Sequence, residues 1–201
     1  MPDAVAVQLL LASRSPRRAD LLRTLGVSFA VVDVDIDERP LPDEEPAAYV
    51  ARLARGKARA GFATARARGL PVLAADTTVV LDGAILGKPA DAAAARAMLA
   101  SLGGRAHQVL TGVAVIDVRG DLHAAVVSTQ VRFRALEARE IGAYVASGEP
   151  ADKAGGYGIQ GLGGALVAGI DGSYSNVVGL PLAETLALLT AVGVPHALAG
   201  G

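Results

Sequence analysis

Two arginines stand in the first turn of an expected helix, directly after a serine and a proline. Ser15 is a typical helix N-cap and Pro16 suits the first helical position. Arg17 and Arg18 therefore lie where the partial positive charge of the helix N-terminus disfavours cations. An anionic ligand would offset that cost, because backbone N–H groups and guanidinium forks both bind phosphate. The segment Ser13–Arg18 thus favours phosphate binding, and the alternative is a solvated surface pair.

One aspartate, Asp76, interrupts the largely apolar run Pro71–Leu81. A carboxylate is costly to bury unless it is paired, hydrogen-bonded or bound to a metal ion. A catalytic or metal-binding role would account for this position, and the alternative is an aspartate that caps a turn at a strand end. Glu38, in an acidic loop, is a second candidate ligand for a hard cation that prefers oxygen. Taken alone, an acidic loop is more often simply solvated.

Lysine is rare in this chain, since only three of its 19 basic residues are lysines and the rest are arginines. Lys88 lies in Gly87-Lys88-Pro89, and Lys153 directly precedes Ala154-Gly155. In loops beside glycine, a compact ammonium group can reach a phosphate. Lys57 falls on an expected helix and, on its own, is interpreted as a solvated surface residue. Chance retention of three ordinary surface lysines is the alternative.

Other familiar motifs are not supported. Residues 83–88 resemble a P-loop, but the spacing is one residue short and Pro89 replaces the required Ser or Thr. Residues 156–161 match G-x-G-x-x-G, yet they precede an expected strand instead of opening a helix. There is no G-x-S-x-G element, so a hydrolase triad has no support. The histidines are dispersed, and each is expected to be structural: His107, His123 and His196.

Apolar runs, caps and turns predict the elements that position these residues. Strands are expected at 8–12, 29–34, 71–81, 109–118, 124–133 and 166–170. Helices are expected at 16–25, 46–68, 92–99, 137–146 and 182–192, and Asp91 is expected to cap the third of them. The connections include a polar loop at 35–45, turns at 82–83 and 119–121, and a glycine-rich loop at 148–164. This order predicts a mixed sheet in an α/β fold, with no linker that separates domains.

Composition limits the class of protein. With 201 residues, 52% of them hydrophobic and 19% charged, the chain fits one folded domain or one two-lobed unit. The net charge is −1, and the sequence has no run of like charges. Nothing in it therefore suggests a surface that binds duplex nucleic acid or an anionic membrane. The absence of cysteine excludes disulfides, thiolate zinc sites and a cysteine nucleophile.

The opening segment, residues 1–13, carries Asp3 in place of the basic region of a signal peptide and is expected to form a buried strand. No apolar run approaches the ~20 residues of a membrane-spanning helix. We therefore expect a soluble, cytoplasmic protein.

Six ordered segments together resemble the Maf family of nucleotide pyrophosphatases across nearly the whole chain. Each is weak alone, but their order and spacing together are specific. The segments are Ser13-Arg14-Ser15-Pro16-Arg17-Arg18, Ile36-Asp37-Glu38, Ala75-Asp76-Thr77, Gly87-Lys88-Pro89, residues 152–161 and residues 172–181.

The resemblance implies a fold, a reaction and partners. The fold would be an elongated mixed sheet flanked by helices, in two lobes with a central cleft, similar to inosine triphosphatases and forming a single domain over residues 1–201. The reaction would be hydrolysis of a nucleoside triphosphate between the α- and β-phosphates, with a divalent cation, Mg²⁺ or Mn²⁺, as cofactor. A homodimer is also implied.

The resemblance further assigns roles to residues. Asp76 matches the catalytic proton acceptor, and Glu38 with Asp76 matches the metal site. Three positions match those that set substrate preference: Arg17, Thr77 and Gln160. The phosphate-contacting positions are Ser13, Arg18, Lys57, Lys88 and Lys153.

Two features resemble the branch of the family that prefers dTTP and UTP: the arginine pair after Pro16 and the run Tyr157–Gln160. The branch that prefers 7-methyl-GTP typically has a bulky aromatic between the proline and the arginine. One departure is Gly156, where alanine is more usual, and it touches no assigned role. The alternatives are a 7-methyl-GTP pyrophosphatase and a non-catalytic, nucleotide-binding regulator of cell division, which would release no pyrophosphate.

Overall fold

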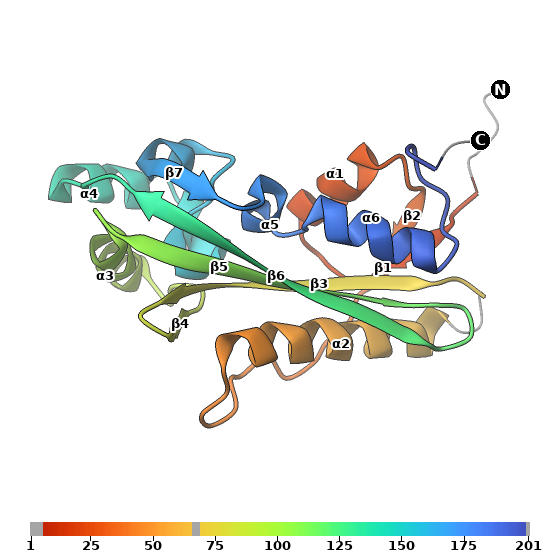
Figure 1. Cartoon of the computed structure of the whole chain (residues 1–201). Coiled ribbons are helices and arrows are strands. Elements are labelled where there is room, and N and C mark those ends of the chain that lie inside the picture. The colour runs from red at the N-terminus through yellow and green to blue at the C-terminus, as the bar shows by residue number, and fades with distance from the viewer. Residues whose placement is uncertain (1–5, 66–68, 200–201) are drawn as a thin grey trace. The chain divides into compact units, whose positions relative to one another are not determined.

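The computed structural model describes residues 6–65 and 69–199 (Figure 1). The strands are β1 (Leu9–Leu11), β2 (Phe29–Val31), β3 (Val72–Leu81), β4 (Ala84–Leu86), β5 (Ala106–Ile116), β6 (Leu122–Phe133) and β7 (Val167–Asp171). The α-helices are α1 (Pro16–Thr24), α2 (Pro46–Ala65), α3 (Ala92–Leu102), α4 (Ala138–Ala146), α5 (Tyr174–Val178) and α6 (Leu182–Ala191). Within these ranges, no helix combines the length and the apolar character needed to cross a membrane.

The strands form one mixed sheet in the order β2-β1-β3-β5-β6-β7, with β4 beside β3. Strand β1 runs parallel to both neighbours, with Leu9 opposite Phe29 on β2 and Leu10 opposite Val72 on β3. Strand β3 pairs antiparallel with β4, and β6 with β7. The α/β fold with a mixed sheet flanked by helices is thereby confirmed.

The chain divides into two compact units, each made of separate segments. The described residues of the first unit fall within Met1–Asp76, Thr111–Val126 and Gly179–Gly201, and those of the second within Thr77–Leu110 and Val127–Val178. Three of these boundaries fall inside strands β3, β5 and β6, so a strand and not a linker continues from one unit into the other.

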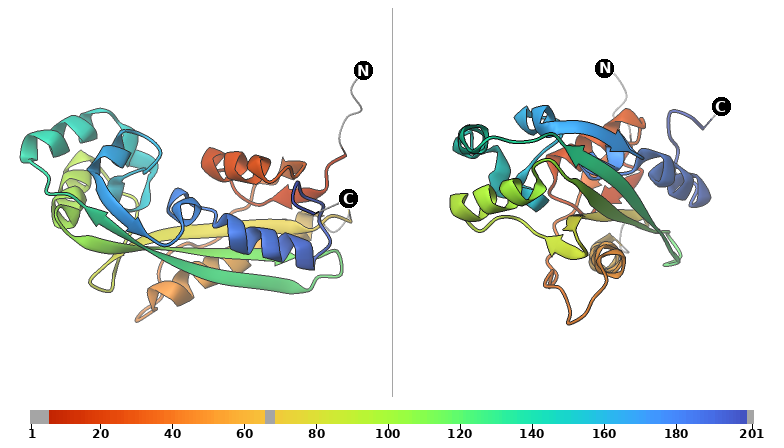
Figure 2. Two further views of the ribbon diagram at one scale, coloured as in Figure 1. Left: turned by 45° about the horizontal axis from the view of Figure 1, so that its top comes forward. Right: turned by 60° about the vertical axis from the view of Figure 1, so that its left-hand side comes forward.

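In the first unit, α2 covers one face of the sheet and α1 and α6 cover the other (Figures 1 and 2). Small residues let α2 approach the strands closely, above all at Gly112 on β5, where an added Cβ would lie 2.3 Å from the carbonyl oxygen of Val50. The core beneath α2 consists of Leu10, Ala12, Ala54, Ala58, Val72, Ala74, Ala114 and Ile116. This packing holds α2 directly against β3, the strand that carries Asp76.

In the second unit, α3 packs beside α4 (Figure 2), and a cluster of three buried aromatic rings lies among the aliphatic side chains of the core. His107, Phe133 and Tyr157 meet edge to face, with ring centroids 4.7–5.4 Å apart. His107 Nε2 lies 2.7 Å from the Tyr157 hydroxyl oxygen. The structural role expected for His107 is confirmed.

The buried His107 makes stability depend on pH. Burial lowers the pKa of His107 from 6.5 to about 4. Between these values an unfolded chain binds the proton and the folded chain does not, so the stabilising contribution is complete above pH 6.5 and is lost as the pH falls to about 4. We expect the loss to approach about 3 kcal/mol in the free energy of unfolding.

Urea unfolding of the parent and a His107→Gln variant between pH 7 and pH 4 would measure this effect. Between pH 7 and pH 4 the free energy of unfolding should fall less for the variant than for the parent, whatever its value at pH 7. His123→Gln serves as the matched control, because His123 lies on the partly exposed start of β6. If the stability curves of the parent and of His107→Gln run parallel, the assignment to His107 is wrong.

The structure contains several short elements that the sequence patterns did not predict. Strand β4 and helix α5 were not expected, because three and five residues are too few to carry a periodic pattern. The loop at 148–164 contains three short 3₁₀ turns, Glu149–Asp152, Ala154–Gly156 and Leu162–Leu166. The expected end of one helix, residues 66–68, and the start of the opening segment, residues 1–5, lie outside the described residues.

Candidate active site

Asp76 is a buried carboxylate in the middle of β3, with 10% of its side chain exposed. Its Oδ1 accepts a hydrogen bond from Lys57 Nζ at 2.6 Å. Lys57 Nζ also lies 2.7 Å from Glu38 Oε1. Two carboxylates that are far apart in the sequence therefore converge on one ammonium group.

The interpretation of Lys57 as a solvated surface residue is wrong, because only 12% of its side chain is exposed. Helix α2 presents this residue toward β3, where Ala54 and Ala58 of the same helix are fully covered. A lysine is rarely buried unless it is paired. Its position between Asp76 and Glu38 supplies that pairing.

The loop that carries Glu38 is fastened to the start of α2. The Tyr49 hydroxyl donates to the backbone carbonyl of Glu38 at 3.0 Å. Arg52 donates to both carboxylate oxygens of Glu44 at 2.6 Å, a bidentate pair. Burial, together with the charges of Asp76 and Glu38, raises the pKa of Tyr49 to about 12, so its hydroxyl remains a donor at neutral pH.

The start of α1 brings a second basic group to the site. Ser15 caps the helix, its Oγ accepting the Arg18 backbone N–H at 3.4 Å. The Arg18 side chain donates to the carbonyl of Gly179 at 2.8 Å and to Ser13 Oγ at 3.3 Å. Burial lowers the pKa of the Arg18 guanidinium, and the charge of Asp76 opposes that shift. The guanidinium is thus within electrostatic reach of the Asp76 carboxylate.

The carboxylates fit a hard divalent cation that is completed by other ligands. Asp76 and Glu38 already hold one positive charge between them, that of Lys57 Nζ. Mg²⁺ at phosphate-handling sites commonly takes one or two carboxylates, with the remaining ligands from substrate oxygens and water. Across the described ranges, no group of three or more His, Cys, Asp or Glu side chains could hold a metal ion. A closed, all-protein cage is therefore not what these residues form.

Five of the residues expected at the site lie together in the first unit: Ser13, Arg18, Glu38, Lys57 and Asp76. Arg17 is the preceding, partly buried residue of α1. Its charge contributes to the lowered pKa of Arg18. The first unit therefore combines two carboxylates with a cluster of basic groups.

The other expected residues belong to the second unit. Thr77 follows Asp76 directly and is partly buried. Gly155 N–H donates to the carbonyl of Gly87 at 3.0 Å, so the loop with Lys88 lies beside the segment with Lys153. Lys88 and Gln160 are exposed. Lys153 Nζ donates to the Glu149 carbonyl and to Asp152 Oδ1, both at 2.6 Å.

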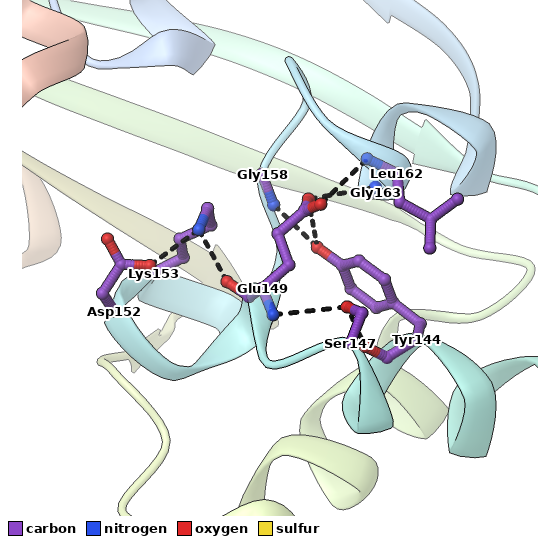
Figure 3. A network of polar contacts seen from close by, with 8 residues as sticks. All are labelled: Tyr144, Ser147, Glu149, Asp152, Lys153, Gly158, Leu162 and Gly163. Carbon is purple, nitrogen blue, oxygen red and sulfur yellow. Dashed lines mark hydrogen bonds and ion pairs between the residues drawn. The ribbon is translucent and has the colours of Figure 1, made fainter.

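Glu149 and Tyr144, which no sequence pattern identified as functional, are at the centre of the hydrogen-bond network in Figure 3. The Glu149 carboxylate accepts hydrogen bonds from the Tyr144 hydroxyl and from the backbone N–H groups of Leu162 and Gly163. One signal could have found it: Glu149 opens a glycine-rich stretch, where many backbone donors are within reach of a carboxylate.

Known proteins resemble this chain over almost its full length. The family model described as Maf-like protein matches residues 8–192. A dTTP/UTP pyrophosphatase of Methylobacillus flagellatus is 53% identical over 192 residues, which is 96% of each chain. A dTTP/UTP pyrophosphatase of Anaeromyxobacter sp. is 56% identical, over 95% of this chain and 92% of that protein. One of Escherichia coli O157:H7 is 56% identical, over 90% of this chain and 91% of that protein.

Proposed function

Because the chain belongs to the Maf-like protein family, we propose that it hydrolyses nucleoside triphosphates, dTTP and UTP above all, to the monophosphate and pyrophosphate. The observation that carries this proposal is the convergence of Asp76 and Glu38 on the ammonium group of Lys57. Relatives that share more than half of their residues with this chain, and cover nine tenths of it, are named dTTP/UTP pyrophosphatases. In this proposal, residues 1–201 serve as one functional domain.

In the proposed mechanism, Asp76 accepts a proton from the attacking water. The water oxygen forms a bond to the α-phosphorus while the bond from that phosphorus to the oxygen bridging to the β-phosphate breaks. Pyrophosphate leaves, and the proton of the water passes to the Asp76 carboxylate. The hydrogen bond from Lys57 at 2.6 Å orients this carboxylate. A positioned general base contributes about 10²- to 10⁴-fold in rate.

Basic groups bind the phosphates and neutralise charge as it develops on the leaving group. Ser13, Arg18 and Lys57 do so from the first unit, and the resemblance adds Lys88 and Lys153. Glu38 and Asp76 would hold the divalent cation, Mg²⁺ or Mn²⁺. When bound, that ion polarises the phosphate oxygens. Positioning and charge neutralisation supply most of the rate, because pyrophosphate leaves with high negative charge.

Arg17, Thr77 and Gln160 select the base in this proposal. Gln160 is suited to that role, because its exposed side chain carries both donors and an acceptor. The homodimer also belongs to the proposal, and sedimentation velocity at several protein concentrations would test it.

Pyrophosphate release from a panel of nucleotides tests the proposed function. We expect release to be fastest from dTTP and UTP, slower from CTP, GTP and ITP, and abolished when EDTA removes Mg²⁺ and Mn²⁺. Release mainly from 7-methyl-GTP would overturn the pyrimidine preference but keep the reaction. If no nucleotide yields pyrophosphate while equilibrium dialysis detects stoichiometric binding, the chain is a nucleotide-binding regulator and not an enzyme.

A further inference from the structure

We infer that Glu149 is a positioning residue for the base-recognition loop, a name we give to residues Gly158–Gly163. This inference rests on the proposed function, because it takes Gln160 of that loop as the residue that contacts the base. Neither Glu149 nor its partner Tyr144 is among the residues that the family resemblance assigns to the reaction.

One end of the base-recognition loop is bound directly to the Glu149 carboxylate (Figure 3). Oε2 accepts the backbone N–H of Leu162 at 2.9 Å. Oε1 accepts the backbone N–H of Gly163 at 3.1 Å. Hydrogen bonds to a charged acceptor are roughly twice as strong as those between neutral groups. This end of the loop is therefore firmly placed.

The other end of the loop is bound to the same carboxylate through Tyr144. The Tyr144 hydroxyl accepts the backbone N–H of Gly158 at 3.1 Å and donates to Glu149 Oε1 at 2.9 Å. Tyr144 itself is immobilised, because only 2% of its surface is exposed. One carboxylate thus fixes both ends of a short segment, and Gln160, between those ends, is exposed.

Close packing explains why this segment is rich in glycine. A Cβ added at Gly161 would lie 2.4 Å from Glu149 Oε2, and one at Gly163 would lie 2.5 Å from the Tyr144 hydroxyl oxygen. The G-x-G-x-x-G match at residues 156–161 therefore has a physical meaning different from a dinucleotide site. Its last glycine, Gly161, packs directly against the Glu149 carboxylate.

Glu149 also orients a basic residue, because its backbone carbonyl accepts Lys153 Nζ at 2.6 Å. The same hydrogen bonds favour the charged state of the Glu149 side chain. Burial raises the pKa of Glu149, but the hydrogen bonds from Gly163, Tyr144 and Leu162 have the larger combined effect and hold that pKa below its ordinary value. At neutral pH the loop is consequently built around a carboxylate that acts only as an acceptor.

A Glu149→Gln variant tests the inference with little change in shape. Both carboxylate oxygens face N–H donors, so the amide must point its own NH₂ group at one of them. We expect hydrogen exchange of the peptide covering residues 157–165 to accelerate about tenfold or more, as the loss of a charged hydrogen bond implies. We also expect kcat/KM for dTTP to fall by about tenfold, and the preference for dTTP over CTP and GTP to narrow.

Comparison variants separate loop positioning from general destabilisation. Gln160→Ala should narrow the base preference to a similar extent without accelerating exchange in the loop. Tyr144→Phe keeps the ring but removes the hydrogen bonds of the hydroxyl to Gly158 and to Glu149. The bonds from Leu162 and Gly163 to Glu149 remain, so this variant should give a smaller effect of the same kind. It also keeps the inference testable if Glu149→Gln does not fold. Glu45→Gln, a matched substitution at an exposed residue before α2, should leave exchange and base preference unchanged.

The outcomes distinguish the inference from the proposed function. A folded Glu149→Gln variant with the base preference of the parent would overturn the positioning role, whether or not the loop exchanges faster. A parent that releases no pyrophosphate from any nucleotide would instead sink the proposed function, and the role of Glu149 in base recognition with it. Faster exchange together with a narrowed base preference would establish that Glu149 positions the loop.

Discussion

Replacing Asp76 with asparagine is expected to lower the rate of pyrophosphate release from dTTP by roughly 10²- to 10⁴-fold while the fold stays intact. Asparagine has nearly the same shape, and its carbonyl oxygen can still accept the hydrogen bond that Asp76 Oδ1 receives from Lys57 at 2.6 Å. An amide cannot accept the proton of the attacking water or bind a divalent cation as a carboxylate does. The measurement is kcat from pyrophosphate release, with urea unfolding to establish that the variant is folded.

Asp82→Asn is the matched control, because it makes the same substitution close to Asp76 in the sequence but outside the proposed site. Asp82 directly follows β3, is exposed and pairs with Arg105 at 2.7 Å, outside the proposed site. Its left-handed backbone conformation, with φ of 50°, is one that asparagine tolerates well. We expect the activity of the Asp82→Asn variant to stay within about twofold of the parent, because a surface ion pair contributes little to stability. A folded Asp76→Asn protein that kept more than about a tenth of the parent rate would refute the assignment of Asp76 as the general base.

Replacing Gly112 with alanine is expected to reduce the free energy of unfolding by about 3 kcal/mol. The new Cβ would lie 2.3 Å from the carbonyl oxygen and 2.7 Å from the carbonyl carbon of Val50. Both atoms belong to the backbone of α2, so a rotamer change cannot relieve the overlap and the helix itself must move. That helix carries Lys57 and Tyr49, so kcat should fall as well, even at temperatures where the variant remains folded.

Urea unfolding measures the effect of Gly112→Ala on stability, with Gly142→Ala as the control variant. Gly142 lies within α4, and a Cβ there would meet no atom within 4 Å. Alanine is favoured over glycine within a helix, so this control should be as stable as the parent or more stable by up to about 1 kcal/mol. If Gly112→Ala unfolded at the urea concentration of the parent, α2 would not be held against β5 as closely as the structure indicates.

Most of the secondary structure could be predicted from the sequence, because it depends on interactions between residues that are close together along the chain. The cap at Ser15, with its bond to the N–H three residues ahead, places the start of α1 correctly, as Asp91 does for α3. The strand expected at residues 124–133 is confirmed within β6, where Thr129, Val131 and Phe133 are buried and the residues between them are exposed. The cost of placing a carboxylate in an apolar strand likewise identified Asp76 before any partner was known.

Only the tertiary structure decided which of these residues meet. Lys57 and Asp76 are 19 positions apart, and nothing in the residues around Lys57 distinguishes a buried ion pair from a solvated lysine. The three residues of β4 become a strand only because β3 lies beside them to accept and donate hydrogen bonds. The sequence alone therefore determined the fold class and drew attention to Asp76 and to the segment Ser13–Arg18, because these inferences depend on neighbours within a few positions along the chain. The partner of Lys57, the close approach at Gly112 and the loop held by Glu149 depend on how distant segments pack, which no local pattern encodes.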